Sequence, residues 1–129
     1  MTPETSRYLE KARQCLSNAK AALGYGLSND AGRGAYLTVF HAAQALIFEQ
    51  TGKVAKTHQG VQSEFHRLAK REPRIDKAFA PFLGQAYNLK AVADYETGPD
   101  SNIPLERSAA ALETATRFVA CIAELLATS

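Results

Sequence analysis

The sequence has little of what usually marks a secreted, membrane-bound or metal-stapled protein. Its 129 residues include two cysteines, one methionine and no tryptophan. Because it contains no run of about 18 uncharged apolar residues, we expect no membrane-spanning segment. The first ten residues, Met1 to Glu10, are polar and of mixed charge. We therefore expect no secretory signal peptide and a cytoplasmic protein.

Residues that bind metals or attack substrates are equally sparse. Cys15 and Cys121 lie near opposite ends of the chain and lack metal-ligand spacing. We expect each to act as a small hydrophobic residue on a helix face, with a disulfide as the alternative. The histidines His41, His58 and His66 have no zinc-protease spacing, and the sequence contains no phosphate-binding glycine loop or nucleophile elbow. The sequence thus predicts neither a metal nor a cofactor.

Helical spacing of apolar residues runs through almost the whole chain. A first helix is predicted to begin after Thr2 and to end at residues 24–26, and a second to end at Thr51-Gly52. Asn29 or Asp30 is expected to cap that second helix. Thr57 is expected to cap a shorter helix that ends before Pro73. A fourth helix covers about residues 75–96, and a last one begins near Pro104.

Some positions carry specific structural expectations. Pro81 lies inside the fourth segment, where it either kinks the helix or marks its true start. The apolar face of the first helix is predicted to be Tyr8, Ala12, Cys15, Ala19 and Leu23. Apolar residues make up 46% of the chain, enough for one core without staples. We predict an all-α fold in one domain, residues 1–129: an antiparallel up-and-down bundle of four long helices plus one short helix.

A homodimer is also expected from the sequence. The last helix carries apolar residues beyond a single stripe, and homodimers are the commonest oligomers. These additional residues are Ala110, Phe118 and Leu125.

Charge is uneven along the chain. The net charge is +2, but residues 53–77 contain seven basic residues against three acidic ones, a local charge of +4. Such a stretch attracts phosphate or an acidic partner, although a solvated helix face gives the same count. The basic residues are Lys53, Lys56, Arg67, Lys70, Arg71, Arg74 and Lys77.

Two polar stretches are unusual for a simple bundle. In Ala35–Leu46 an imidazole, His41, interrupts an apolar helix. In Asn88–Tyr95, Lys90 and Asp94 are four residues apart and therefore share a helix face, where they either pair on the surface or form part of a site. Lys90 borders the apolar face, so its charge must pair or reach solvent.

With these stretches the chain resembles the HEPN family, in particular its small free-standing prokaryotic members often paired with a minimal nucleotidyltransferase. The resemblance rests on Ala35–Leu46, on Thr57-His58-Gln59-Gly60-Val61 followed by Phe65, and on Leu89–Tyr95, in this order. It extends over about residues 9–126. It implies a helical bundle, dimerisation and membership of a toxin–antitoxin-type pair.

Ribonuclease members of this family use an arginine followed, after four to six residues, by a histidine, and this sequence has no such pair. Lys90 and Asp94 stand before Tyr95 where that motif would lie; aligning on Tyr95 instead would place Asn88 and Ala93 there. Lysine lacks the bidentate fork of arginine, and aspartate is ionised at neutral pH, so it is not readily an acid. The resemblance therefore predicts an interaction module rather than an enzyme.

Several residues are nevertheless candidates for a site. Lys90, Asp94 and His58 are the candidate catalytic residues if an unorthodox ribonuclease activity survives. By resemblance, Tyr95 is a candidate for nucleotidylation by the partner enzyme, the alternative being a ring that packs at the helix end. A third possibility is a non-catalytic nucleotide- or RNA-binding protein. The candidate nucleotide- or RNA-binding residues are Tyr36, His41, His58, Lys90, Asp94 and Tyr95.

Overall fold

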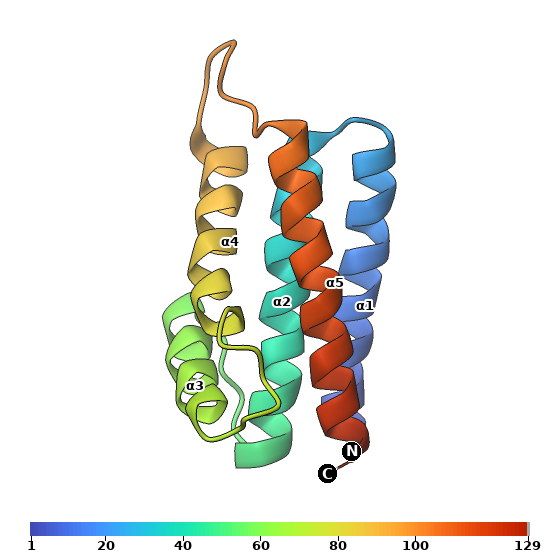
Figure 1. Cartoon of the computed structure of the whole chain (residues 1–129), viewed down its shortest axis with the longest axis vertical. Helices are drawn as coiled ribbons and strands as arrows, with labels where there is room; N and C mark the ends of the chain where they lie inside the picture. Colours follow the sequence, from blue (N-terminus) through green and yellow to red (C-terminus); the bar gives the residue numbers. More distant parts are fainter. Residues whose placement is uncertain (129) are drawn as a thin grey trace.

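Five helices build the described part of the chain, and four of them run side by side along the long axis of the molecule (Figure 1). The computed structural model describes residues 1–128. Short α3 lies against one end of α4, so the all-α prediction of four long helices and a short one is confirmed. None of the helices in this part of the chain is long and apolar enough to cross a membrane. The helices are α1 (Pro3–Gly24), α2 (Ser28–Thr51), α3 (His58–Lys70), α4 (Phe79–Tyr95) and α5 (Leu105–Ala127).

Helix α2 is the centre of the bundle, because it packs against all four other helices. Small residues make this possible: Ala42, Ala43 and Ala45 are fully buried. A methyl group added at Gly34 would lie 2.5 Å from the Cβ of Ala19, so the backbones of α1 and α2 approach closely there. The alanines of α2 are therefore used inside one copy of the chain.

Local capping signals define several helix ends as the sequence predicts. The Thr2 hydroxyl accepts a hydrogen bond from the Thr5 amide at 3.1 Å, and the Thr57 hydroxyl accepts one from the Gly60 amide at 3.0 Å. Gly52 ends α2 in the left-handed conformation, with φ of 71°. Pro81 lies in the first turn of α4, which begins at Phe79; of the two possibilities for this proline, it marks the true start.

The predicted cap of α2 is wrong. The helix begins at Ser28, and neither Asn29 nor Asp30 caps it. The Asn29 side chain accepts a hydrogen bond from the amide of Ile103 at 3.0 Å instead, and Asp30 pairs with Arg33. The tertiary contact to the loop before α5 thus takes the side chain that local reasoning assigns to the cap.

The predicted face of α1 is shifted by one residue at two positions. Leu9 and Leu16 are buried, with 3% and 9% exposure, whereas Tyr8 and Cys15 lie at the edge of the core. Tyr8 packs its ring against Phe48, with centroids 6.2 Å apart. Both choices satisfy helical spacing, and the packing of α1 against α2 and α5 buries the leucines most deeply.

The expected dimer surface on α5 is also wrong in its residues. Phe118 is fully buried and Leu125 is 5% exposed within one chain, leaving only Ala110 at the surface. The Phe118 ring lies 5.0 Å from Phe65 of α3 and 5.1 Å from Phe79 of α4, measured between centroids. α5 needs a wide apolar face because it covers several helices of its own chain, so this width does not indicate a second copy.

Candidate functional site

The candidate residues of α2, α3 and α4 meet along one line of contacts, which we call the α2–α4 strip. It consists of Arg33 and Tyr36 from α2, His58 from the start of α3, and Tyr87, Lys90 and Asp94 from α4. Helical spacing places Arg33 with Tyr36, and Tyr87 with Lys90 and Asp94, on the facing sides of two neighbouring helices.

One carboxylate holds the two cations of the strip together. Asp94 accepts a hydrogen bond from Arg33 Nε at one oxygen and from Lys90 Nζ, at 2.8 Å, at the other. Arg33 also donates to Asp30 at 2.9 Å. The Arg33 and Lys90 side chains are about one-third and 28% exposed, and Asp94 is 22% exposed. Two cations thus face two carboxylates, and the cluster is neutral.

These contacts keep Asp94 ionised. The hydrogen bonds from Lys90 and Arg33 lower the pKa of the Asp94 carboxyl below its ordinary value of 3.8. The same bonds to Asp94 raise the pKa values of Arg33 and Lys90. Because its pKa is lowered, the Asp94 carboxyl is deprotonated at neutral pH and cannot donate a proton there. Both cations are already engaged by carboxylate oxygens.

The other half of the strip is aromatic. The His58 ring stacks on Tyr87 with centroids 3.8 Å apart and an interplanar angle of 13°. The hydroxyl of Tyr36 lies 3.1 Å from Nδ1 of His58, and the Tyr36 ring meets the edge of Tyr87 at 5.5 Å. The rings of Tyr36 and His58 also pack, with centroids 5.7 Å apart, so one polar contact and three ring contacts join the three helices.

Burial governs the ionisation of these rings. Desolvation raises the pKa of Tyr36 to about 12, with a smaller contribution from Tyr87. Desolvation also lowers the pKa of His58 below 6.5, while a hydrogen bond from the imidazole to Gln62 opposes that change. His58 is therefore mainly uncharged at neutral pH, and its Nδ1 shares a hydrogen bond with the Tyr36 hydroxyl.

Two predicted residues lie differently from the rest. Tyr95 ends α4 and is 75% exposed, with Lys90 Nζ 5.9 Å from its ring centroid, so the ring does not pack into the core. His41 is outside the strip: its Nδ1 bonds to Gln44 at 2.8 Å, and Gln44 donates to the carbonyl of Ala55 at 2.7 Å. Burial lowers the pKa of His41. That imidazole tethers the segment after α2, and the structure does not bring it to the other candidates.

Sequence reasoning missed Arg33 and Tyr87 as members of the strip. Along the sequence Arg33 stands out only as the arginine before His41, eight residues away on the same helix. Its actual partner, Asp94, is 61 residues away. The spacing of Arg33 to Tyr36 and of Tyr87 to Lys90, three residues in each case, is the local signal that could have found them.

The basic stretch at residues 53–77 is divided by its ion pairs. Arg67 pairs with Glu64 at 2.8 Å, and Arg74 pairs with Glu72 at 2.8 Å. In the described part of the chain the remaining cations of this stretch make no ion pair: Lys53, Lys56, Lys70, Arg71 and Lys77. The positive charge that faces solvent therefore comes mainly from the lysines.

Comparison with known proteins decides the family. The HEPN domain family matches residues 5–127. The chain belongs to the HEPN family. A relative from Methanocaldococcus jannaschii, MJ0605, which bears the provisional name of a toxin, is 33% identical to this HEPN domain over 94 residues, covering 73% of this chain and 69% of that protein.

A solved structure agrees with this HEPN fold. The crystal structure of TT1696 from Thermus thermophilus superposes with a TM-score of 0.80, covering 95% of this chain and 98% of that one at 19% identity. The likeness concerns the fold alone, because the identity is low. The resemblance read from Ala35–Leu46, Thr57–Val61 and Leu89–Tyr95 is thus confirmed at the level of the family.

Proposed function

We propose that this HEPN domain, residues 1–129, is a helical interaction module: the HEPN half of a toxin–antitoxin-type pair with a minimal nucleotidyltransferase, working as a homodimer without the Arg/His ribonuclease chemistry. Family membership and the toxin name of the M. jannaschii relative support the two-component part of this proposal. The homodimer rests on resemblance to the family, since Phe118 and Leu125 no longer argue for it.

The observation that carries the proposal is the double contact of Asp94. In place of a free arginine and a histidine, the strip holds a carboxylate shared by Arg33 and Lys90. A phosphate would have to displace Asp94 from both cations, and the Asp94 carboxyl, whose pKa is lowered, cannot act as an acid at neutral pH. The cluster fixes α4 to α2, which suits a rigid docking surface better than proton transfer.

A pull-down of the tagged chain from its own cells tests this directly, with bound protein and RNA identified together. We expect a stoichiometric second protein with a nucleotidyltransferase fold, and a dimeric mass for the chain alone by light scattering at micromolar concentration. Recovery of RNA without a protein partner contradicts the interaction module and favours RNA binding.

The alternative function, an unorthodox ribonuclease, predicts a different result. If Lys90, Asp94 and His58 formed an unorthodox catalytic group, RNA cleavage by the purified chain would disappear in Lys90→Ala and Asp94→Ala. We expect no cleavage above that of these two variants. Cleavage in the native chain that is lost in both variants contradicts the proposal.

Tyr95 is the residue we propose for modification by the partner. Its high exposure at the end of α4 leaves the ring and its hydroxyl available to a second protein. Intact-mass measurement after incubation with the captured nucleotidyltransferase and nucleoside triphosphate should show one nucleotidyl group. Tyr95→Phe should abolish the addition, and Tyr87→Phe, a matched change at a 40% exposed tyrosine, should not.

A further inference from the structure

A groove separate from the α2–α4 strip lies between the end of α3 and the start of α4. Two adjoining hollows, of about 500 and about 600 Å³, share His66, Ala80 and Pro81 in their linings. One extends toward the loop that follows α3, and the other toward the first turns of α3. We call their union the α3–α4 groove.

The floor of this groove is aliphatic. Ala69 of α3, Ile75 and Pro73 of the connecting loop, and Ala80 and Pro81 of α4 line the first hollow. Ile75 and Ala80 are only 4% and 9% exposed, so they close the bottom of the hollow rather than project from it. An aliphatic floor of this size accepts one or two apolar side chains.

Unpaired cations stand at the rim. Lys70 and Lys77 line the first hollow, are exposed, and make no ion pair with any described residue. Two carboxylates, Glu72 and Asp76, line the same hollow, and each has an ion-pair partner outside that lining. Glu72 pairs with Arg74 at 2.8 Å, and Asp76 lies 3.9 Å from Arg117. Because both carboxylates are balanced in this way, the charges of Lys70 and Lys77 remain uncompensated at the rim of the apolar centre.

The second hollow differs in character. Gln59, Gln62 and Ser63 line it together with His66. Amide and hydroxyl groups of this kind bind backbone carbonyls and amides without demanding a charge. An elongated ligand with its own peptide groups fits an apolar pocket that continues into such a polar one.

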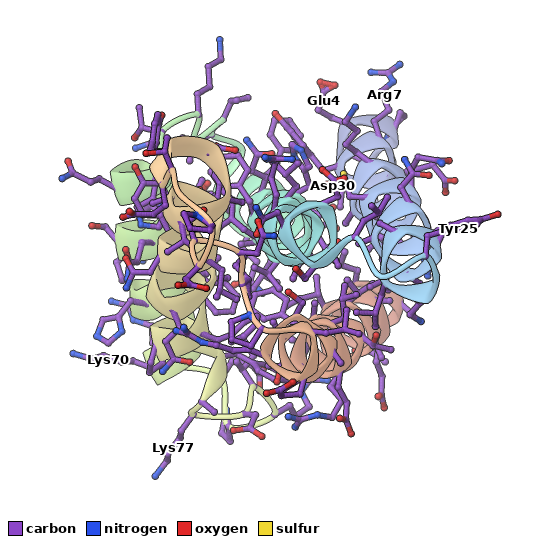
Figure 2. The ribbon with its side chains drawn as sticks, turned by 90° about the horizontal axis from the view of Figure 1, so that it is seen from above. Glu4, Arg7, Tyr25, Asp30, Lys70 and Lys77 are labelled. Atoms are coloured by element: carbon purple, nitrogen blue, oxygen red, sulfur yellow. The ribbon has the colours of Figure 1, made fainter. Side chains whose placement is uncertain are left out.

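From these features we infer that the α3–α4 groove binds an acidic amphipathic segment of a partner protein. Its apolar side chains lie on the floor formed by Ala69, Ala80 and Pro81, and its carboxylates meet Lys70 and Lys77. Peptide is favoured over nucleic acid by the geometry of the rim. In Figure 2 the Lys70 and Lys77 side chains extend outward in different directions, so they do not converge on a single phosphate. The floor between them is aliphatic, and His66 is the one aromatic ring in the described lining, whereas single-stranded nucleic acid stacks successive bases on several rings.

The test uses the full-length chain, labelled with nitrogen-15, and a synthetic probe peptide in which two leucines are flanked by glutamates. We expect saturable amide shifts centred on Ala69, Lys70, Lys77 and Ala80. The double variant Lys70→Glu/Lys77→Glu should weaken binding about tenfold or more. Lys53→Glu/Lys56→Glu is the matched control, since it reverses two unpaired, exposed lysines outside the groove. That control should retain affinity within about twofold.

Comparison probes distinguish the outcomes. A peptide with glycine in place of leucine should bind more weakly, because the floor would be unused, and single-stranded polyuridylate should not shift the groove amides. Equal loss in both double variants, equal binding of the leucine-free peptide, or no saturation by the leucine peptide below about 1 mM would overturn the inference. Groove shifts with polyuridylate alone would replace it with an RNA site. Because the probe is a synthetic peptide, this result is independent of whether the natural partner is a nucleotidyltransferase.

Discussion

The α2–α4 strip and the α3–α4 groove both contain basic residues, yet they present opposite electrostatic situations. In the strip, Asp94 and Asp30 engage Arg33 and Lys90, and the cluster is neutral. In the groove, the carboxylates of Glu72 and Asp76 pair with Arg74 and Arg117, so Lys70 and Lys77 remain unpaired. Counting charges along the sequence marks residues 53–77 as basic but does not say which of these charges are paired. The two regions are distinguished by whether each cation has an ion-pair partner: paired cations connect helices, and unpaired cations can attract a ligand.

The largest expected effect falls on the groove. Phe118 packs against Phe65 of α3 and Phe79 of α4, the two helices that border the groove. Its buried ring therefore stabilises the position of both helices. Phe118→Ala should cost about 3–5 kcal/mol of unfolding free energy through lost burial and a cavity. Urea denaturation followed by circular dichroism measures this. The ion pairs between α2 and α4 should persist in the fraction that remains folded. A decrease in unfolding free energy of less than about 1 kcal/mol would mean that other contacts hold α3 and α4 in place.

The strip should respond next. Asp94→Asn leaves Arg33 and Lys90 beside each other without their shared carboxylate, which should cost about 1 kcal/mol at pH 7, since the partners are partly exposed. Because the pKa of Asp94 is lowered by folding, its contribution is complete above the ordinary value of 3.8 and is lost as the pH falls through the folded value. Urea midpoints of the native chain and of the variant should therefore differ at about pH 7 and draw together as the pH falls below 3.8. A gap that stays constant with pH would assign the effect to something other than charge.

A smaller pH effect is expected at His58. Burial lowers its pKa below 6.5, so the unfolded chain binds a proton more readily, and the stability from this group is complete above pH 6.5 and declines as the pH falls below it. Proton NMR titration of the imidazole should place its midpoint below 6.5. His41 shifts in the same direction, so His41→Gln is needed to assign the two resonances. A His58 midpoint above 6.5 would contradict the stacked, neutral ring.

The smallest effect should come from the rim of the groove. Because Lys70 and Lys77 are exposed and unpaired, Lys70→Glu/Lys77→Glu should change the unfolding free energy by no more than about 0.5 kcal/mol. Thermal denaturation tests this, and a clear destabilisation would mean that the lysines have structural partners. Comparison of this variant with Asp94→Asn shows how strongly the contribution of a basic residue to stability depends on whether it is paired.

Much of the architecture could be predicted because its signals are local. Thr2, Thr57 and Gly52 define helix ends through contacts within a few residues, and apolar spacing gives the five helices. The pairing of Lys90 with Asp94 also follows from their spacing of four residues on one helix. The three motifs that resemble the HEPN family are short and ordered along the chain, so they too can be read without a fold.

The features that only the tertiary structure decided are contacts between residues far apart in the chain. The sequence could not choose Leu9 and Leu16 over Tyr8 and Cys15, because both pairs fit helical spacing and only the packing of α1 within the bundle separates them. It could not show that Arg33 meets Asp94 across 61 residues, or that Phe118 is needed inside its own chain. The pattern of amino acids determined which helices form and which face of each is apolar. Packing then determined which charges are paired and which remain available, because an ion pair depends on distance in space rather than along the chain.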